Sequence, residues 1–387
     1  MGAWLREIWA SGRKRAIVGA VALLVVLAGV AVTVILLAGS NGDTAASAGA
    51  SPTATVTIPA SPTATAQPSS TPTPHTGILD GLPMSDADWN ARKDLLPIAV
   101  MFDNAPGAYP QYGLDKADIV YEAFVEGGIT RFMGIYWSQE ADYLEPIRSA
   151  RTPFVVWADE YGALYAHAGE ADTDNAANAG GQMVEWNIFA LNAFAPGPSS
   201  AFYRDDQRYA PHNLVTGTLP LRAAAASLGY AGPPTVAPWL FKDSAAPTAS
   251  APAAEGIEIN FEGERIPWEL VQWHWDAASK SYLRYQFGGP AIDAKTQQQL
   301  RFTNVVVMQT STEVVDDSGH VLLGQFGSGP ATVFMDGRQI AATWKKADRK
   351  ARTRYYDANG NEIAFNRGPI FIEVIGLQST VTVAATV

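Results

Sequence analysis

The sequence predicts an α+β protein in two parts, a mixed α/β N-terminal lobe and a β-rich C-terminal lobe, preceded by a single transmembrane helix and a disordered linker. Three observations support this: a long uncharged run, a Pro/Ser/Thr/Ala-rich stretch after it, and many short strand-like runs between turn residues. The predicted segments are a basic tail (1–15), an anchor (16–38), a linker (39–78), an N-terminal lobe (79–243) and a C-terminal lobe (255–387).

The predicted anchor, residues 16–38, has no charged side chain and follows a short basic segment. As a helix it would extend about 34 Å, enough for a hydrocarbon core of about 30 Å. Basic flanks stay in the cytoplasm, so we expect a single-pass cell-membrane protein with a cytoplasmic N-terminus and an extracytoplasmic main domain. A cleaved signal peptide is the alternative, although its apolar region normally spans about 7–15 residues.

The composition argues against several classes of function. The net charge of −11 divides into +3 for residues 1–15 and −14 for the remainder, which argues against nucleic-acid binding. The expected partners are a cell-envelope component or a membrane protein, besides the membrane that residues 16–38 would enter. With no cysteine, the chain has no site for a lipid-bearing cysteine or a disulfide. We expect no cofactor and no metal, since the histidines are scattered and HExxH, Walker A, GxGxxG and GxSxG motifs are absent.

Two low-complexity stretches divide the chain. Ser40–Thr76 consists largely of Ala, Ser, Thr and Pro and cannot form a core, so it reads as a linker that holds the folded part away from the membrane. Ser244–Ala254 has a similar composition and marks a lobe boundary or a long surface loop.

The N-terminal lobe begins with a predicted hairpin. A buried strand at Pro97–Phe102 is followed by strands at Ala117–Glu126 and Ile129–Trp137, with Gly127-Gly128 between them. Two glycines between strand-like runs are typical of a two-residue hairpin loop, because both positions need positive φ.

A two-residue loop fixes the expected register of that hairpin. Phe124 would face Arg131 and Glu122 would face Met133, which puts Arg131 on the same face as Glu122 and Glu126, between the two carboxylates. A longer loop would shift this register.

The remaining elements follow from apolar runs and turn pairs. Helices are expected at Thr152–Tyr161, with Pro153 in its first turn, and at Leu219–Leu228, with a short strand at Leu164–His167. The C-terminal strands are expected at Ile257–Phe261, Glu269–Trp275, Tyr282–Phe287, Asn304–Thr310, Ala331–Met335, Gln339–Lys345 and Ile370–Val374.

Charged residues in apolar surroundings provide the candidate site. Glu122, Glu126 and Arg131 form either an ion-pair ladder or the floor of a polar site. Arg148 and Arg151 precede a predicted helix, where they would bind a phosphate or carboxylate, or else neutralise the two glutamates. The candidate ligand-binding residues are Asp103, Asn104, Glu122, Glu126, Arg131, Arg148, Arg151, His167, Arg204, Arg208, His212 and Asn213; catalytic residues are not assigned.

The other charged segments of the chain allow more than one interpretation. His167, at the end of an apolar strand, suits a hydrogen-bonded structural residue or a base. Arg204, Arg208, His212 and Asn213 lie in a turn-rich loop, and loops often carry function.

The basic run WKKADRKARTR at 344–354 is a solvated loop, a polyanion-binding patch, or a segment that closes over the other lobe.

Several strings resemble those of the YerB-like family, bacterial envelope proteins with a two-part domain of no established activity. The matching strings are PIAVMFDN (97–104), GLDKADIVYEAFVEGGITRFMGIY (113–136), EPIRSAR (145–151), LYAHAG (164–169), YRDDQRYAPHNL (203–214), DAASKSYLRYQFGGPAID (276–293), NVVVM (304–308) and TWKKADRKARTRYYDANGNEI (343–363). The resemblance implies an extracytoplasmic, envelope-linked role around peptidoglycan synthesis or sporulation-type remodelling, and it implies no catalytic residue. Many members look like lipoproteins, whereas this chain has a predicted transmembrane anchor.

The residues leave two hypotheses. The first is a binding or regulatory module for an envelope ligand or protein partner. The second is an envelope enzyme acting on a phosphorylated or glycan substrate, with Asp103 or Glu122 as acid, base or metal ligand and the two arginines holding an anion. The order of strands, aspartates and PIRSAR is also similar in pattern to wall-polymer phosphotransferases of the LytR-CpsA-Psr type.

Overall fold

The computed structural model describes residues 75–244, 251–261 and 270–385. The predicted basic tail, the anchor at 16–38, most of the linker and residues 245–250 lie outside these ranges. Within the described ranges, no helix is long and apolar enough to cross a membrane. The predicted linker ends at residue 78, but His75–Thr76 form strand β1, so its last four residues belong to the folded part.

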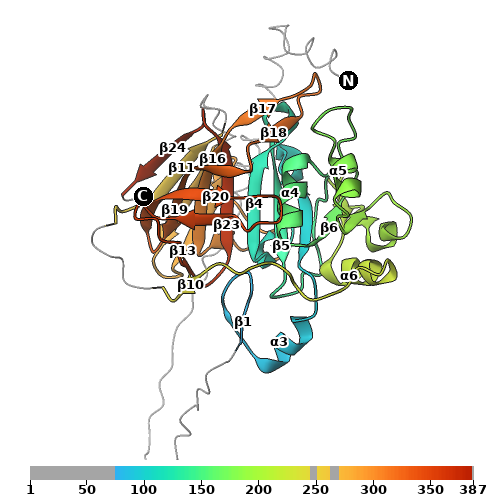
Figure 1. Cartoon of the computed structure of the whole chain (residues 1–387), viewed down its shortest axis with the longest axis horizontal. Helices are drawn as coiled ribbons and strands as arrows, with labels where there is room; N and C mark the ends of the chain where they lie inside the picture. Colours follow the sequence, from blue (N-terminus) through green and yellow to red (C-terminus); the bar gives the residue numbers. More distant parts are fainter. Residues whose placement is uncertain (1–74, 245–250, 262–269, 386–387) are drawn as a thin grey trace, which may run out of the picture. The chain divides into compact units, whose positions relative to one another are not determined.

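A mixed ten-stranded sheet forms the centre of the fold and includes strands from both halves of the chain. In spatial order its strands are β21 (Arg354–Tyr356), β20 (Arg338–Lys346), β19 (Gly327–Met335), β16 (Asn304–Thr310), β23 (Ile370–Gly376), β4 (Ile119–Phe124), β5 (Thr130–Tyr136), β3 (Ile98–Asp103), β6 (Leu164–His167) and β7 (Ala190–Asn192). The two halves join where β23 pairs in parallel with β4, seen in Figure 1 as a red strand beside a cyan one. The two predicted lobes therefore share one sheet.

The inner strands of this sheet are buried on both faces, which is why they read as continuous apolar runs rather than alternating ones. Successive residues enter opposite cores, as in β3, where Val100 and Phe102 belong to one core while Ala99 and Met101 belong to the other. This alternation decides which face each charged residue occupies.

The second, six-stranded sheet packs on the face that carries Phe102 and Phe132, because its apolar residues belong to that core. It contains β14 (Gly289–Pro290), β13 (Ser281–Gln286), β12 (Val271–Asp276), β11 (Gly256–Asn260) and β24 (Thr380–Ala384), with β15 (Arg301–Phe302) paired to β13. Two-stranded ribbons are β1 with β2 (Pro83–Met84), β8 (Tyr203–Arg204) with β9 (Leu214–Val215), β10 (Phe241–Lys242) with β22 (Phe365–Asn366), and β17 (Thr312–Val314) with β18 (Val321–Leu323). The fold is thus mixed α+β with a β-rich C-terminal part.

The helices are short. The α-helices are α3 (Asp86–Arg92), α4 (Thr152–Glu160), α5 (Ala179–Glu185) and α6 (Thr218–Ser227), and the 3₁₀ turns are η1 (Pro106–Ala108), η2 (Leu114–Lys116), η3 (Glu126–Gly128) and η4 (Pro198–Ala201). α4 has Pro153 in its first turn, as predicted, and it contributes Phe154, Val155 and Trp157 to the core opposite the six-stranded sheet. Figure 1 shows α4 beside β4 and β5.

The predicted β4–β5 hairpin exists, but its register was wrong by one residue. Phe124 pairs with Thr130, and Glu126, Gly127 and Gly128 form a three-residue turn in place of a two-residue one. Both glycines have positive φ, as expected. Arg131 pairs with Ala123, and Glu122 pairs with Phe132, so Glu122 lies on the opposite face from Arg131.

Candidate functional site

The candidate site lies where β3 and β6 separate. These strands pair only over their first three residues, Ile98 to Val100 with Leu164 to Ala166. The segment 146–150 fills the gap beyond: the backbone N–H of Arg148 donates to Met101, and Ala168 donates to the carbonyl of Arg148. Strand ends that diverge in this way commonly form binding crevices. This placement explains why Arg148 and Arg151 come close to the end of β3.

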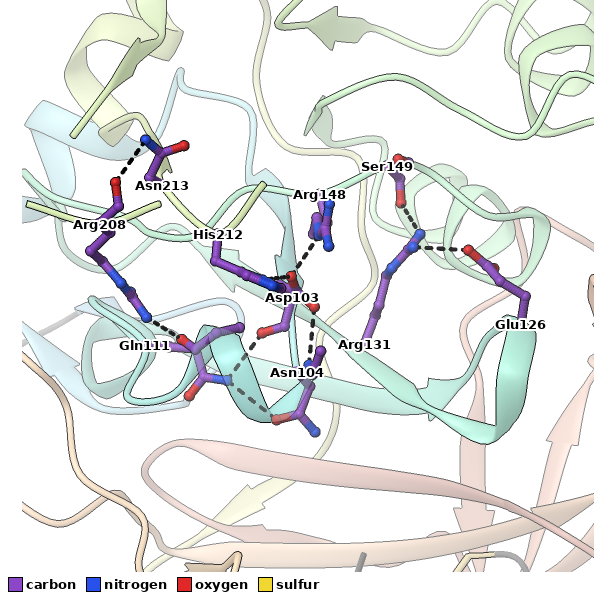
Figure 2. A network of polar contacts seen from close by, with 12 residues as sticks. Asp103, Asn104, Gln111, Glu126, Arg131, Arg148, Ser149, Arg208, His212 and Asn213 are labelled. Atoms are coloured by element: carbon purple, nitrogen blue, oxygen red, sulfur yellow. Dashed lines mark hydrogen bonds and ion pairs between the residues drawn. The ribbon is translucent and has the colours of Figure 1, made fainter. Parts of the chain in front are cut away.

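Asp103 is the centre of the first cluster of charged groups. Its side chain is 1% exposed, and its Oδ2 accepts from Nε of Arg148 and from Nδ1 of His212, both at 2.6 Å. Figure 2 shows Asp103 between these two side chains. Its Oδ1 accepts the backbone N–H of Ala105 at 3.0 Å. A carboxylate with this many donors acts as an anchor for its neighbours rather than as a free base.

Arg148 and His212 are less enclosed than the carboxylate that holds them. Each side chain is 25% exposed. Arg148 uses only Nε on Asp103, and its two terminal nitrogens have no hydrogen-bond partner in the described part of the chain. His212 donates from Nδ1, so its Nε2 carries the free lone pair when the ring is neutral.

The loop that carries His212 is fixed by the other predicted residues in it. Arg204 donates to Asn213 Oδ1 at 2.7 Å, and Asn213 Nδ2 donates to the carbonyls of Asp205 and Arg208 at 2.8 and 3.1 Å. Arg208 reaches back to the carbonyl of Ala108 at 2.8 Å. These contacts shape the loop, so their role is to position His212.

Glu126, Arg131 and Arg151 form the second cluster. Arg151 donates from Nε to Glu126 Oε2 at 2.7 Å and from its NH2 to Oε1, which Arg131 also contacts at 3.0 Å. Arg131 further donates to the carbonyl of Ser149 at 2.9 Å (Figure 2). The expectation that Arg131 pairs with Glu126 is confirmed, while the expected contact with Glu122 was wrong because the two lie on opposite faces.

The two clusters share one electrostatic environment. Burial opposes ionisation of Glu126, but the hydrogen bond from Arg151 and the charge of Arg131 outweigh it and lower its pKa to about 2. The pKa of Arg131 falls to about 10, first through burial and then through the positive charge of Arg151, with Arg148 contributing in the same direction. Three guanidinium groups thus face two carboxylates, Asp103 and Glu126, which leaves a local surplus of positive charge.

Glu122 and Asn104 belong to the opposite face of the sheet. Asn104 Nδ2 donates to Glu122 Oε1 at 3.0 Å and to Thr130 Oγ1 at 2.8 Å, and Thr130 donates to the same Glu122 oxygen. Gln111 links this group to the first cluster through Asn104 Oδ1 and the carbonyl of Asp103. The main partner of Glu122 is Arg284 of β13, at 2.5 Å.

His167 stands apart from both clusters. It is 1% exposed and its Nδ1 donates to the carbonyl of Gly169 at 2.9 Å. Burial lowers its pKa to about 4, so the ring is neutral at physiological pH. It borders a separate hollow that Glu170 and Asn192 also line. Among the described residues, no three His, Asp or Glu side chains are placed to hold a metal ion.

The basic run packs against α4. Lys346 and Arg352 pair with the fully buried Glu160 at 2.6 and 2.7 Å, and Arg349 and Lys350 pair with Asp159. Arg352 also stacks on Trp239, 3.5 Å from the ring centre. Of the three interpretations of this run, contact with the N-terminal part is the one that the structure shows.

Comparisons with known proteins show the family of the chain. The family described as "Protein of unknown function (DUF3048) N-terminal domain" matches residues 81–231, and its C-terminal domain counterpart matches residues 257–372. This chain belongs to the DUF3048 family. A relative, "Putative lipoprotein YerB" of Bacillus subtilis (strain 168), is 30% identical over 253 residues, covering 65% of this chain and 73% of the relative.

A solved structure of the same relative supports the assignment. The crystal structure of the YerB protein from Bacillus subtilis is similar to this DUF3048 protein with a TM-score of 0.68 and 25% sequence identity, over 80% of this chain and 99% of that one. The resemblance to the YerB-like family is therefore confirmed.

One buried charged residue of this DUF3048 protein, Arg284, was not predicted from the sequence as part of the candidate site. Arg284 is fully buried, and it pairs with Glu122 and, at 2.7 Å, with Glu373 of β23. Burial and the charge of Glu122 raise the pKa of Glu373 well above its ordinary value. Strand SYLRYQ carries a charged residue at a position that faces the core, and this alternation was the available signal for Arg284.

Proposed function

We propose that this DUF3048 protein is a membrane-anchored, extracytoplasmic binding module that recognises an anionic group of a cell-envelope component, and that it acts in envelope or peptidoglycan processes. The observation that carries the proposal is Arg148, whose terminal nitrogens are open beside two further arginines and only two carboxylates. A paired fork of guanidinium donors suits phosphate or carboxylate.

The electrostatics support an anion over other ligands. The part of the chain after residue 15 has a charge of −14, so a surplus of positive charge at one point is a local exception. A site lined by one sign of charge attracts ligands of the opposite sign. The name of the Bacillus subtilis relative, a putative lipoprotein, and the uncharged run at 16–38 support membrane attachment of the present chain.

The test is the capture of lipid-linked wall precursors by the full-length protein in detergent. We compare the wild type with Arg148→Gln, which removes the open donors. The matched control is Arg367→Gln, since Arg367 has similar exposure (30%) and also binds a carboxylate through Nε, at 2.8 Å from Asp243. We expect at least tenfold weaker capture by Arg148→Gln and no change in the control; equal capture by all three would refute the proposal.

A second candidate function rests on the Asp103–His212 contact. With Nδ1 held by a carboxylate, Nε2 of His212 is oriented as a general base next to the open nitrogens of Arg148. This arrangement suits hydrolysis or transfer of a phosphorylated envelope substrate. Release of phosphate from pyrophosphate-linked precursors, lost in His212→Asn while capture persists, would favour the enzyme over the binding module.

A further inference from the structure

A small cavity lies on the face of the ten-stranded sheet opposite the arginine clusters, between the β4–β5 hairpin and the six-stranded sheet. Its volume is about 120 Å³. One water needs on the order of 10–15 Å³ and a drug-sized ligand about 300–1,000 Å³. The cavity therefore suits a substituent of a larger molecule. Buried polar side chains form part of its wall: Asn104, Glu122, Thr130 and Gln286.

Gln286 offers an unused donor to this cavity. The residue is 6% exposed, and its Oε1 accepts from Arg284 at 3.1 Å, which fixes the orientation of the amide. Its Nε2 has no hydrogen-bond partner within the residues that the structure describes. This nitrogen is not one of the enclosed unpaired atoms of the described residues, so it is accessible and free to donate. Because Gln286 lines the cavity, this amide is suited to a ligand carbonyl.

The charge around the cavity favours a neutral ligand group. Glu122 lines it directly, and Glu373 and Arg284 lie behind, so the three residues together supply no surplus of positive charge. Each oxygen of Glu122 already accepts at least one hydrogen bond. The cavity therefore offers an anion no surplus of positive charge, in contrast to the arginine clusters.

The remaining wall is apolar and includes Ile129, Phe261 and Phe287. Phe287 has a φ of 54°, followed by Gly288 at 77°, in the turn between β13 and β14. Positive φ at both positions of such a turn favours Asn-Gly, and a bulky side chain there is unusual. The turn places the Phe287 ring at the cavity and against Tyr109, 5.6 Å between ring centres.

We propose that this cavity binds an acetamido group, as carried by the amino sugars of envelope glycans. The carbonyl would accept from Gln286 Nε2, the amide N–H would face the carboxylate of Glu122, and the methyl group would contact Phe261 and Phe287. This inference rests on the proposed function, because it names a second chemical group of the same envelope ligand.

The test is saturation-transfer NMR on the full-length protein with two free sugars. N-acetylglucosamine carries the acetamido group, whereas glucose has a hydroxyl in its place. Gln286→Glu removes the donor and keeps the oxygen that Arg284 contacts. Ile129→Trp blocks the cavity from a residue that is 36% exposed, and Val184→Trp, at an 80% exposed position away from the cavity, is the matched control.

We expect saturation of the acetyl methyl group in the wild type and in Val184→Trp, and at least a tenfold loss of binding in Gln286→Glu and Ile129→Trp. Equal saturation of glucose, or wild-type binding by either folded cavity variant, would overturn the inference. Inorganic pyrophosphate is titrated into the same samples. If it binds through Arg148 while N-acetylglucosamine does not bind, only the cavity assignment fails; if neither binds, the proposed function fails too.

Discussion

Arg284 donates to Glu122 across 2.5 Å, and this contact joins strands that are 162 residues apart in the chain. It fastens β13 of the six-stranded sheet to β4 of the ten-stranded sheet. Phe132, Trp273 and Phe371 surround the guanidinium, with ring centres 4.6–5.3 Å from it. This buried cation therefore joins the two halves of the chain, in addition to the shared sheet and the buried pairs of Lys346 and Arg352 with Glu160.

Replacing Arg284 is expected to destabilise the protein strongly. Arg284→Met leaves Glu122 without its counter-charge in a buried position, and breaking a buried pair costs about 3–5 kcal/mol. Urea unfolding of the full-length protein measures the change. Glu373→Gln is the control: burial and the charge of Glu122 raise the pKa of Glu373, so a neutral replacement at this position should cost far less. Similar losses in both variants would contradict this account.

Glu126 should make stability depend on pH in the acid range. Its pKa is about 2 in the folded protein, against 4.5 as the ordinary value. Its contribution is therefore complete above about pH 4.5 and is lost as the pH falls through 2. Glu126→Gln should cost about 2 kcal/mol at pH 7, allowing for partial exposure. The difference between variant and wild type should vanish near pH 2, and a pH-independent difference would argue against the pairing.

Glu145 should lower the stability of the protein as the pH rises, whereas Glu126 raises it. Burial raises its pKa to about 7 despite Arg208, which lies 3.5 Å away. Since its folded pKa exceeds the ordinary 4.5, stability should decline as the pH rises from about 4.5 to 7 and stay level above. Glu145→Gln should remove this decline and leave the protein about 2 kcal/mol more stable at pH 8. Thermal unfolding across this range would show an unchanged slope if Glu145 is not the group responsible.

The ion pairs between the basic run at 344–354 and α4 should stabilise the folded protein. Glu160 accepts from Lys346, Arg352 and Thr353 and is fully buried. Glu160→Gln is expected to cost about 3–5 kcal/mol, and hydrogen exchange should accelerate both in α4 and at 346–353. Glu362→Gln, which breaks a partly exposed pair with Arg354, should cost less than about 1 kcal/mol. Equal effects of the two changes would show that burial of Glu160 is unimportant.

Local patterns predicted the elements better than their pairing. The strand predicted at Pro97–Phe102 is found at Ile98–Asp103, and the strand at Asn304–Thr310 and the Pro153-containing helix appear where they were predicted, because burial and turn chemistry act over a few residues. The parallel pairing of β23 with β4 joins distant segments, and no local feature of either strand specifies it.

In the candidate site, too, contacts between residues close in the sequence were predictable, and contacts between distant residues were not. Arg148, Arg151, Glu126 and Arg131 were predictable as a group because they lie within 30 residues of one another. The turn of three residues in place of two moved Glu122 to the other face, since side chains alternate with period 2. Its partner Arg284 comes from the other half of the chain and could not be paired with it from sequence spacing.

The central claim is that Arg148 binds an anion, and calorimetric titration of inorganic pyrophosphate into the full-length protein tests it most directly. The account predicts binding by the wild type and by Arg367→Gln, a weakening of at least tenfold in Arg148→Gln, and a decrease in affinity as salt rises. Binding that is equally tight in Arg148→Gln, or absent from the folded wild type, would contradict it.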